Sequence, residues 1–227
     1  QKSKLQISFS YSDGFGREIQ KKIQAETGPV VEGGPVVNPR WVGSGWTVFN
    51  NKGKPVRQYE PFFSATHGFE FGVQVGVSPV LFYDPAERVI ATLHPNHTYE
   101  KVVFDPWQQT TFDVNDTLSK TGPAAPSFDP KNDADVGHFF SRLADDHYLP
   151  TWYDLRTDAA KALLEWPDTD AHGHPLPDNG KRRSAEKSSA EKAVEHADKP
   201  TTAHFDALGR PFLTLVCNRV VCANHAL

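Results

Sequence analysis

The sequence has no methionine, only two cysteines, and no apolar run close to the ~20 residues that span a bilayer. Its first residues show no signal-peptide pattern. With 24 basic and 28 acidic residues, its net charge of −4 gives no basic footprint for nucleic acid. These absences predict a chain with no nucleic-acid partner, no direct membrane insertion and no disulfide framework. Because methionine is missing even at position 1, we expect a piece of a longer chain.

The two cysteines, Cys217 and Cys222, lie four residues apart near the C-terminus. A single C-x4-C pair with no second pair does not fit a zinc site. Free or buried thiols and a local disulfide both stay open. Either way, the 227 residues must be stabilised by an ordinary apolar core.

The sequence contains a repeated motif, which first occurs in SYSDGFGREIQ, from Ser10 to Gln20. Before it, Leu5, Ile7, Phe9 and Tyr11 alternate with polar residues, as on one face of a strand. An Asp at the first corner of a turn bonds the backbone, and a Gly at the fourth tolerates a positive φ. The segment therefore predicts a hairpin whose tip carries D-x-x-G-R.

The phrase returns four more times, with the turn acid or Asn at positions 13, 50, 84, 105 and 206. Most copies put an aromatic residue just before that position and end in a base. The copies are not equal: Glu87 stands where Gly is expected, and the fourth copy has neither Gly nor base. The candidate tip residues are Tyr11, Asp13, Gly16, Arg17, Asn50, Gly53, Tyr83, Asp84, Arg88, Phe104, Asp105, Phe205, Asp206, Gly209 and Arg210.

One hairpin cannot bury its own apolar face, so tandem hairpins must share a core. We therefore predict a mainly β fold, an antiparallel strip of hairpins rather than a compact sandwich. The Tyr-Asp…Gly-Arg pattern resembles the RHS, or YD-repeat, family. Two departures are visible: Tyr11 lies one residue further from its Asp than that pattern has it, and Phe205 replaces Tyr.

The stretch from Leu81 to Thr117 resembles the repeat region of the B component of Tc insecticidal toxin complexes, a group related to SpvB-type toxins. YLPTWYDLR and HADKPTTAHFDALGRPFLT resemble it too. The resemblance implies a wall segment of a hollow shell that encloses the toxic part of the C component. The implied partners are the C component with its enclosed toxic domain and, indirectly, the A-component channel. The implied location is extracellular, secreted by a bacterium as part of a larger chain.

Between the fourth and fifth copies, the pattern changes from strands to helices. We predict a repeat strip at 1–118, a helical insertion with a mobile loop at 119–201, and a resumed repeat at 202–227. Within the insertion, Asp135 is expected to cap a helix that runs to about Tyr148, and a second helix is expected at Thr151–Glu165. Residues 167–184 are predicted to be a loop, followed by a solvated surface helix. The insertion is either a docking element for a partner or a loop excursion with no binding role.

No catalytic constellation emerges, and no cofactor is expected. His94, His97 and Glu100 have helical metal-ligand spacing, but Pro95-Asn96 between them favours a turn. Asp168 and Asp170 open an EF-hand-like pattern that lacks the closing Glu. The adjacent pair Asp145-Asp146 would diverge on a helix, and no Glu-x-Glu or G-x-S-x-G motif occurs. We therefore predict that this segment is not an enzyme.

A rival prediction comes from the aromatic residues, which are 11% of the chain. Trp41 and Trp46 lie close together in sequence and are candidates for a surface that binds carbohydrate or a receptor. The alternative is that they pack between layers, as aromatic side chains on sheets commonly do. Binding by the isolated chain that is lost in Trp41→Ala or Trp46→Ala would favour the rival.

Overall fold

The computed structural model describes residues 5–118, 129–217, 221–222 and 225–226. The chain forms two compact units, residues 1–81 and 82–227. The predicted domain boundaries, which follow motifs rather than compactness, stay predictions. Residues 119–128 of the predicted connection lie outside the described part. So does the side chain of Cys222, whereas Cys217 is exposed.

The first unit is built from short antiparallel strands. One sheet has four strands in the order β1-β2-β5-β8, and β3-β4 and β6-β7 form separate two-stranded ribbons. The strands are β1 Ser8–Ser12, β2 Glu18–Ala25, β3 Gly28–Pro29, β4 Val36–Val37, β5 Arg40–Gly43, β6 Thr47–Phe49, β7 Pro55–Gln58 and β8 Phe62–Ser64. Two hairpins, β1-β2 and β6-β7, carry the first two predicted tips.

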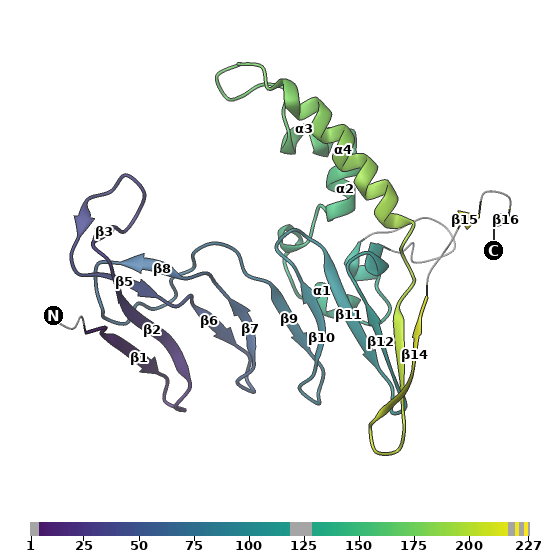
Figure 1. Ribbon diagram of the computed structural model, residues 1–227, viewed down its shortest axis with the longest axis horizontal. Coiled ribbons are helices and arrows are strands. Elements are labelled where there is room, and N and C mark those ends of the chain that lie inside the picture. Colours follow the sequence, from purple (N-terminus) through teal and green to yellow (C-terminus); the bar gives the residue numbers. More distant parts are fainter. Residues whose placement is uncertain (1–4, 119–128, 218–220, 223–224, 227) are drawn as a thin grey trace. The chain divides into compact units, whose positions relative to one another are not determined.

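The second unit holds a six-stranded antiparallel sheet in the order β14-β13-β12-β11-β10-β9 (Figure 1). Its strands are β9 Val80–Tyr83, β10 Val89–Leu93, β11 Tyr99–Phe104, β12 Gln108–Phe112, β13 Thr201–Phe205 and β14 Pro211–Val216. The pair β15 Val221–Cys222 and β16 His225–Ala226 is separate. The three remaining predicted tips lie at one end of the large sheet, because successive hairpins turn there (Figure 1).

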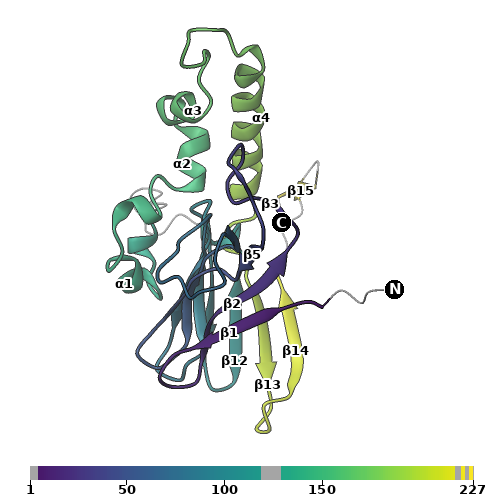
Figure 2. The same cartoon turned by 90° about the vertical axis from the view of Figure 1, so that its left-hand side faces the viewer.

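All the helices of the described residues lie between β12 and β13. They are η1 Asp116–Leu118, η2 Pro130–Asn132, α1 Gly137–Phe140, η3 Asp145–His147, α2 Trp152–Thr157, α3 Ala159–Glu165 and α4 Pro177–Val194. Since β12 and β13 pair directly, from Gln108↔His204 to Thr111↔Thr201, this segment is inserted between neighbouring strands. Helices α2, α3 and α4 leave the end of the sheet opposite the tips (Figure 2).

Three helix predictions were wrong in detail. The helix expected to run to Tyr148 stops at Phe140. Asp133, not Asp135, accepts the backbone N–H groups of Asp135 and Val136 just before this helix. The helix expected at Thr151–Glu165 is two helices, since Asp158 leaves the helical conformation and caps α3. Finally, α4 begins at Pro177, inside the predicted loop.

The main core lies where the insertion covers one face of the large sheet. Phe140 and Tyr148 are fully buried, and the ring of Phe140 contacts those of Phe82, Tyr99 and Tyr148. At ~25 cal/mol per Å² of apolar surface, aromatic side chains of this size dominate the free energy of packing. The insertion is thus part of the core of its unit.

The prediction of a mainly β, antiparallel fold with some helix is confirmed. In the described part of the chain, no helix is both long and apolar enough to cross a membrane.

Candidate functional site

The candidate site is the set of hairpin tips, and the first tip shows its chemistry. Asp13 Oδ1 accepts the backbone N–H groups of Phe15 and Arg17 at 2.8 and 3.0 Å. Its Oδ2 accepts from Arg17 Nε at 2.6 Å. Gly16 completes the turn with φ of 78°, a conformation that costs other residues free energy. One carboxylate therefore fixes both the backbone of the turn and the base that follows it.

The same arrangement recurs in the third and fifth tips. Asp84 Oδ2 accepts from Arg88 Nε at 2.7 Å, and Asp206 Oδ2 accepts from Arg210 Nε at 2.8 Å. Gly209 has φ of 72°, and Glu87 adopts φ of 66° although it is not glycine. The backbone geometry of the turn thus holds even where its usual residue is missing.

The remaining two predicted tips keep the turn but not the ion pair. Asn50 Oδ1 accepts the N–H groups of Lys52 and Lys54 at 3.0 and 2.9 Å, with Gly53 at φ of 80°. Asp105 closes a turn that is one residue shorter, from its own N–H to the carbonyl of Gln108 at 2.9 Å. All five predicted positions therefore lie in turns between paired strands.

A sixth tip was missed by the sequence analysis. Asp170 Oδ1 accepts the N–H groups of His172 and His174 at 2.8 and 2.9 Å, and the His174 ring lies 2.9 Å from Oδ2. Gly173 has φ of 83°, and Thr169 pairs with Pro175 across the turn. The D-x-x-G-base pattern was visible, but it lies between helices, and its opening residues suggested a calcium loop instead.

The electrostatics of the tips follow from these contacts. Burial acts to raise the pKa of Asp13, but hydrogen bonds from the Arg17 side chain and backbone outweigh it and hold the pKa below its usual value. The same balance lowers the pKa of Asp84. For Asp206, the hydrogen bond from Arg210 is the main cause of a lowered pKa. These three carboxylates are therefore stabilised in their ionised form by the arginines of their own turns.

Two tip arginines also contact the next tip along the chain. The Arg17 guanidinium lies 4.6 Å from the centre of the Phe49 ring, and that of Arg88 lies 3.9 Å from the Phe104 ring. A Cβ added to Gly53 would come within 2.7 Å of Arg17, so the first two tips are closely packed. We call this the arginine–ring contact. In it, the arginine of one tip lies on the ring of the aromatic residue that immediately precedes the next turn.

A buried polar cluster, also missed from sequence, holds the insertion on the sheet. Lys101 Nζ lies 2.9 Å from Asp133 and 2.7 Å from Asp135, and the Tyr99 hydroxyl donates to Asp133 at 2.7 Å. Burial raises the pKa of Tyr99, and the neighbouring Asp133 raises it further. Burial opposes ionisation of Asp133, but the bond from Lys101 outweighs it and lowers that pKa. The cluster is a largely buried ion pair whose polar groups bond one another.

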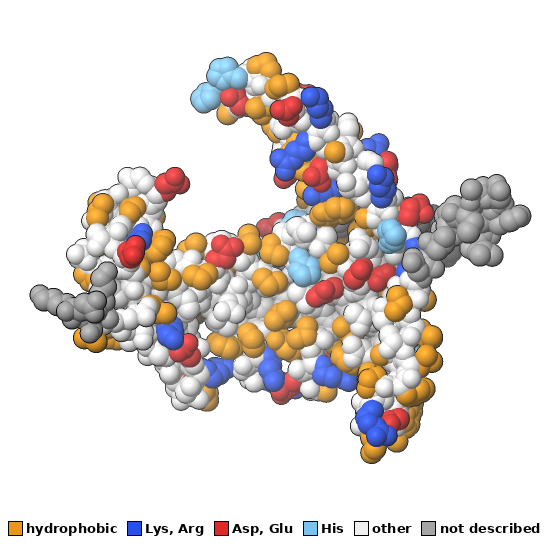
Figure 3. All heavy atoms as spheres, in the orientation of Figure 1, with side chains coloured by type: hydrophobic (Ala, Val, Ile, Leu, Met, Phe, Trp, Pro, Cys, Tyr) orange, Lys and Arg blue, Asp and Glu red, His pale blue; other side chains and the backbone are white. Residues whose placement is uncertain are grey.

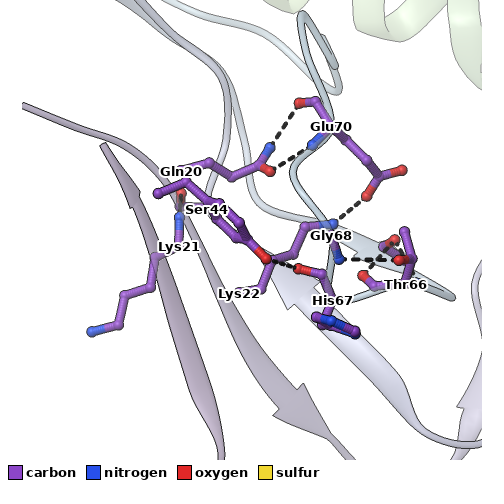
Figure 4. Close-up of polar contacts among 10 residues, drawn as sticks. Gln20, Lys21, Lys22, Ser44, Thr66, His67, Gly68 and Glu70 are labelled. Atoms are coloured by element: carbon purple, nitrogen blue, oxygen red, sulfur yellow. Dashed lines mark hydrogen bonds and ion pairs between the residues drawn. The ribbon is translucent and has the colours of Figure 1, made fainter. Parts of the chain in front are cut away.

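The first unit has a comparable polar clamp between strand β2 and the loop that follows β8 (Figure 4). The Gln20 side chain donates to the carbonyl of Glu70 at 3.0 Å and accepts its N–H at 2.9 Å. Lys22 pairs with the Glu70 carboxylate. Both β2 side chains are almost completely buried, so this loop forms part of the core of the unit.

Both candidate tryptophans contact neighbouring aromatic rings. Trp41 is 5% exposed and its ring contacts those of Phe9 and His67. The Trp46 ring contacts those of Phe69 and Phe71. The ring of Trp41 is therefore not available as a platform at the surface.

Of the histidine and carboxylate candidates, His94 and Glu100 approach one another, with His94 Nε2 4.0 Å from Glu100 Oε2. His94 and His97 lie in the turn between β10 and β11, where the His97 ring is 2.7 Å from the carbonyl of Pro150. Asp168 pairs with Arg183, and Asp145 pairs with Lys131. Over residues 5–118 and 129–217, no three His, Cys, Asp or Glu side chains are placed to hold a metal ion.

The solved structures that match this chain include two that contain TcdB2 and TccC3 of a Tc toxin. One contains TcdB2, TccC3 and Cdc42, with a TM-score of 0.53 and 17% identity over 97% of this chain. The other lacks the hypervariable C-terminal region, with a TM-score of 0.50 and 17% identity over 97% of this chain. The chain shares their fold. It spans about 8% of the length of those chains. No family model matches the sequence, and no curated protein matches it.

Proposed function

We propose that this chain is a non-enzymatic wall segment of an RHS-repeat shell, which encloses and helps to deliver a toxic polypeptide in a Tc-type toxin complex. Its partners would be the C component with its enclosed toxic domain and, indirectly, the A-component channel. It would act outside a bacterial cell as part of a larger secreted chain.

The observation that carries this proposal is the recurrence of one tip chemistry at the first, third and fifth predicted tips. Asp13–Arg17, Asp84–Arg88 and Asp206–Arg210 make the same backbone and ion-pair contacts in three different hairpins. A repeated unit that cannot bury its own face is typical of an array in which each unit is covered by its neighbours. The likeness to TcdB2–TccC3 supports the same interpretation at the level of the fold.

The non-enzymatic part of the proposal rests on what the polar groups already do. The carboxylates of Asp13, Asp84 and Asp206 are ion-paired with arginines of the same turn. Asp133 and Lys101 neutralise one another under the insertion. These groups are thus already engaged in ion pairs, whereas acid–base or nucleophilic catalysis needs a group that is free to exchange a proton or to attack.

A graft tests the proposal. The region of TcdB2 that this chain matches is replaced by the chain, and the chimera is co-expressed with TccC3. We expect the chimera to co-purify with TccC3 and to protect the enclosed polypeptide from protease. A matched chimera carries the same graft with Asp84→Ala, Arg88→Ala, Asp206→Ala and Arg210→Ala, and should lose protection.

Two results would count against a wall segment. One is a wild-type graft that leaves the enclosed polypeptide as protease-sensitive as a flexible linker of equal length does. The other is saturable glycan or receptor binding by the isolated chain that Trp46→Ala abolishes, which would favour the rival binding module.

A further inference from the structure

The turn between α3 and α4, which forms the sixth tip, carries two histidines. Figure 3 shows histidine side chains gathered at the outer end of these helices, and His172 and His174 are both exposed. The centres of their rings lie 6.1 Å apart. Imidazole nitrogens are ligands that suit zinc, copper and nickel ions. The pair is therefore a candidate for binding such an ion.

The backbone below the two rings is held by hydrogen bonds. Asp170 Oδ1 accepts the N–H groups of His172 and His174 at 2.8 and 2.9 Å. The N–H of Asp170 donates to the carbonyl of His174 at 2.9 Å, and that of Gly173 donates to the carbonyl of Asp170 at 3.1 Å. Both histidines are thus positioned before any ligand binds, which lowers the entropy that binding would cost.

Asp170 also determines which nitrogen of His174 can bind a metal. Its Oδ2 lies 2.9 Å from Nδ1 of the ring. The hydrogen bond from His174 is the main cause of a lowered pKa of Asp170, so this carboxylate is ionised and can only accept. Nδ1 therefore carries the proton, and the neutral ring keeps the lone pair of Nε2 for a ligand. A carboxylate bonded to the other ring nitrogen is the usual partner of metal-binding histidines.

The second ring can reach the same ion by rotation of its side chain. With Zn–N bonds of about 2.0–2.1 Å, two imidazole rings on one tetrahedral zinc have centres about 5 Å apart. The rings of His172 and His174 are only slightly further apart than that. Among the residues that the structure describes, the His172 ring has no hydrogen bond that must break first. The gap can therefore close while the backbone stays in place.

The neighbouring carboxylates do not supply a third ligand. Asp168 pairs with Arg183, and Asp170 is engaged by the turn and by His174. This agrees with the finding that no three-residue metal set occurs over residues 5–118 and 129–217. Two protein ligands leave the remaining positions of a four-coordinate ion to water or to a group from a partner.

The other closely spaced histidines, His94 and His97, do not offer the same donors. Nδ1 of His97 lies 2.7 Å from the carbonyl of Pro150, and Nε2 of His94 lies 4.0 Å from Oε2 of Glu100. Each of these rings thus faces a different neighbour.

We propose that His172 and His174 form a surface site for a divalent first-row transition metal ion, bound through two imidazole nitrogens and open at its remaining positions. Asp170 is the positioning residue of this site. The inference goes beyond the proposed function and does not depend on it. Cu²⁺ should bind more tightly than Ni²⁺ or Zn²⁺, whereas Mg²⁺ and Ca²⁺, which take oxygen ligands, should not bind.

The test titrates the whole chain, purified without a histidine tag, with NiCl₂ and ZnCl₂ by isothermal titration calorimetry. We expect saturable binding of one ion per chain, and none when MgCl₂ is the titrant. The double variant His172→Ala/His174→Ala should lose this binding. His196→Ala is the matched control, since His196 is an exposed histidine just after α4, and it should bind as the wild type does.

Asp170→Asn tests the positioning role. An asparagine can still accept the backbone N–H groups, as Asn50 does in the second tip, so the melting temperature of the metal-free chain should not change. The carboxylate that holds the proton on Nδ1 of His174 is lost, however, and the affinity for Ni²⁺ should fall about ten-fold. Nitrogen-15 NMR of the ring should show the Nδ1–H tautomer in the wild type and a shift toward the Nε2–H tautomer in the variant.

Paramagnetic broadening by Cu²⁺ locates the ion in the wild-type chain, where the amide signals of residues 170–174 should broaden first. Three results would overturn the inference: no saturable binding of Ni²⁺ or Zn²⁺, binding that the double variant retains, or broadening that begins at residues 94–100 instead. An unchanged Ni²⁺ affinity in Asp170→Asn would overturn the role given to Asp170.

Discussion

The guanidinium of Arg88 is held between two groups: its Nε donates to Asp84 at 2.7 Å, and its plane lies 3.9 Å from the centre of the Phe104 ring. The carboxylate belongs to the same turn and the ring to the next one. An arginine in this position therefore links the turn geometry of one hairpin to the packing of that hairpin against the next one. Lysine, a point charge without a planar fork, cannot make both contacts equally well.

This joint contact predicts a measurable coupling energy. Arg88→Ala should lower the free energy of unfolding by about 1 kcal/mol, since the cation–π contact contributes about 0.5–1 kcal/mol and a half-exposed ion pair contributes little. A double-mutant cycle with Phe104→Leu, measured by urea denaturation, should give a coupling of about 0.5–1 kcal/mol. Strictly additive effects would show that the two tips are not energetically linked.

The positive φ of Glu87 predicts a stabilising substitution. Glu87 adopts a left-handed backbone conformation. This conformation costs free energy in a residue with a Cβ atom, whereas Gly16 and Gly209 adopt it without that cost. Glu87→Gly should raise stability by about 0.5 kcal/mol, after the greater flexibility of glycine in the unfolded chain is subtracted. Gly16→Ala should lower it by about 1 kcal/mol through the backbone alone, because a Cβ there meets no other atom within 4 Å. Thermal melts check both signs, and a Glu87→Gly variant that melts lower would refute this interpretation.

The buried ion pair predicts a strong and pH-dependent effect. Lys101 and Asp133 have side chains that are 10% and 5% exposed, so Asp133→Ala should cost about 3–5 kcal/mol, because it removes the buried partner of the lysine and the acceptor of the Tyr99 hydroxyl and leaves Lys101 only the pair with Asp135. Asp135→Ala is the matched control, because the side chain of Asp135 is 43% exposed and its loss should cost far less.

The pH dependence follows from the lowered pKa of Asp133. Its stabilising contribution is complete above the pKa of the unfolded chain, about 3.9, and is lost as pH falls through the lower folded value. Wild-type stability should therefore fall steeply below about pH 4. Asp133→Asn, which has no proton to take up, should flatten that part of the curve, and an unchanged slope would argue against the assignment.

Gly45 predicts a steric requirement in the first unit. A Cβ at this position would lie 1.6 Å from the carbonyl oxygen of Tyr59, which is backbone and cannot rotate away. Gly45→Ala should therefore cost about 3 kcal/mol or prevent folding of the unit. Gly14→Ala should be almost neutral, because a Cβ there meets nothing within 4 Å. Near-UV circular dichroism of the tryptophans distinguishes the two.

The sequence located the tips well because their signal is local. Asp13, Asn50, Asp84, Asp105 and Asp206 each contact backbone within four residues, so a short pattern contains the whole cause of the turn. The sixth tip has the same local pattern, but its neighbours form helices rather than strands. It was missed because the motif was expected only between two strands.

Long-range contacts could not be found in the same way. Lys101 and Asp133 are 32 residues apart, and no periodic pattern connects them. The side chains of Gln20 and Lys22 on strand β2 are buried, although an alternating pattern predicts apolar residues at buried positions. They are buried because the loop that contains Glu70 covers them.

The start of α4 was missed for a third reason. Pro177 and Asp178 suggest a turn, yet proline is well tolerated in the first turn of a helix. Arg183 on the same helix contacts the carbonyl of Trp166 and the carboxylate of Asp168, which holds that first turn against α3.

The most direct measurement is a cryo-electron-microscopy map of the TcdB2 graft that carries this chain, assembled with TccC3. The account predicts that the hairpins of residues 5–217 run consecutively in a wall around enclosed density. A map in which these residues form a separate surface module, with no enclosed polypeptide, would contradict it.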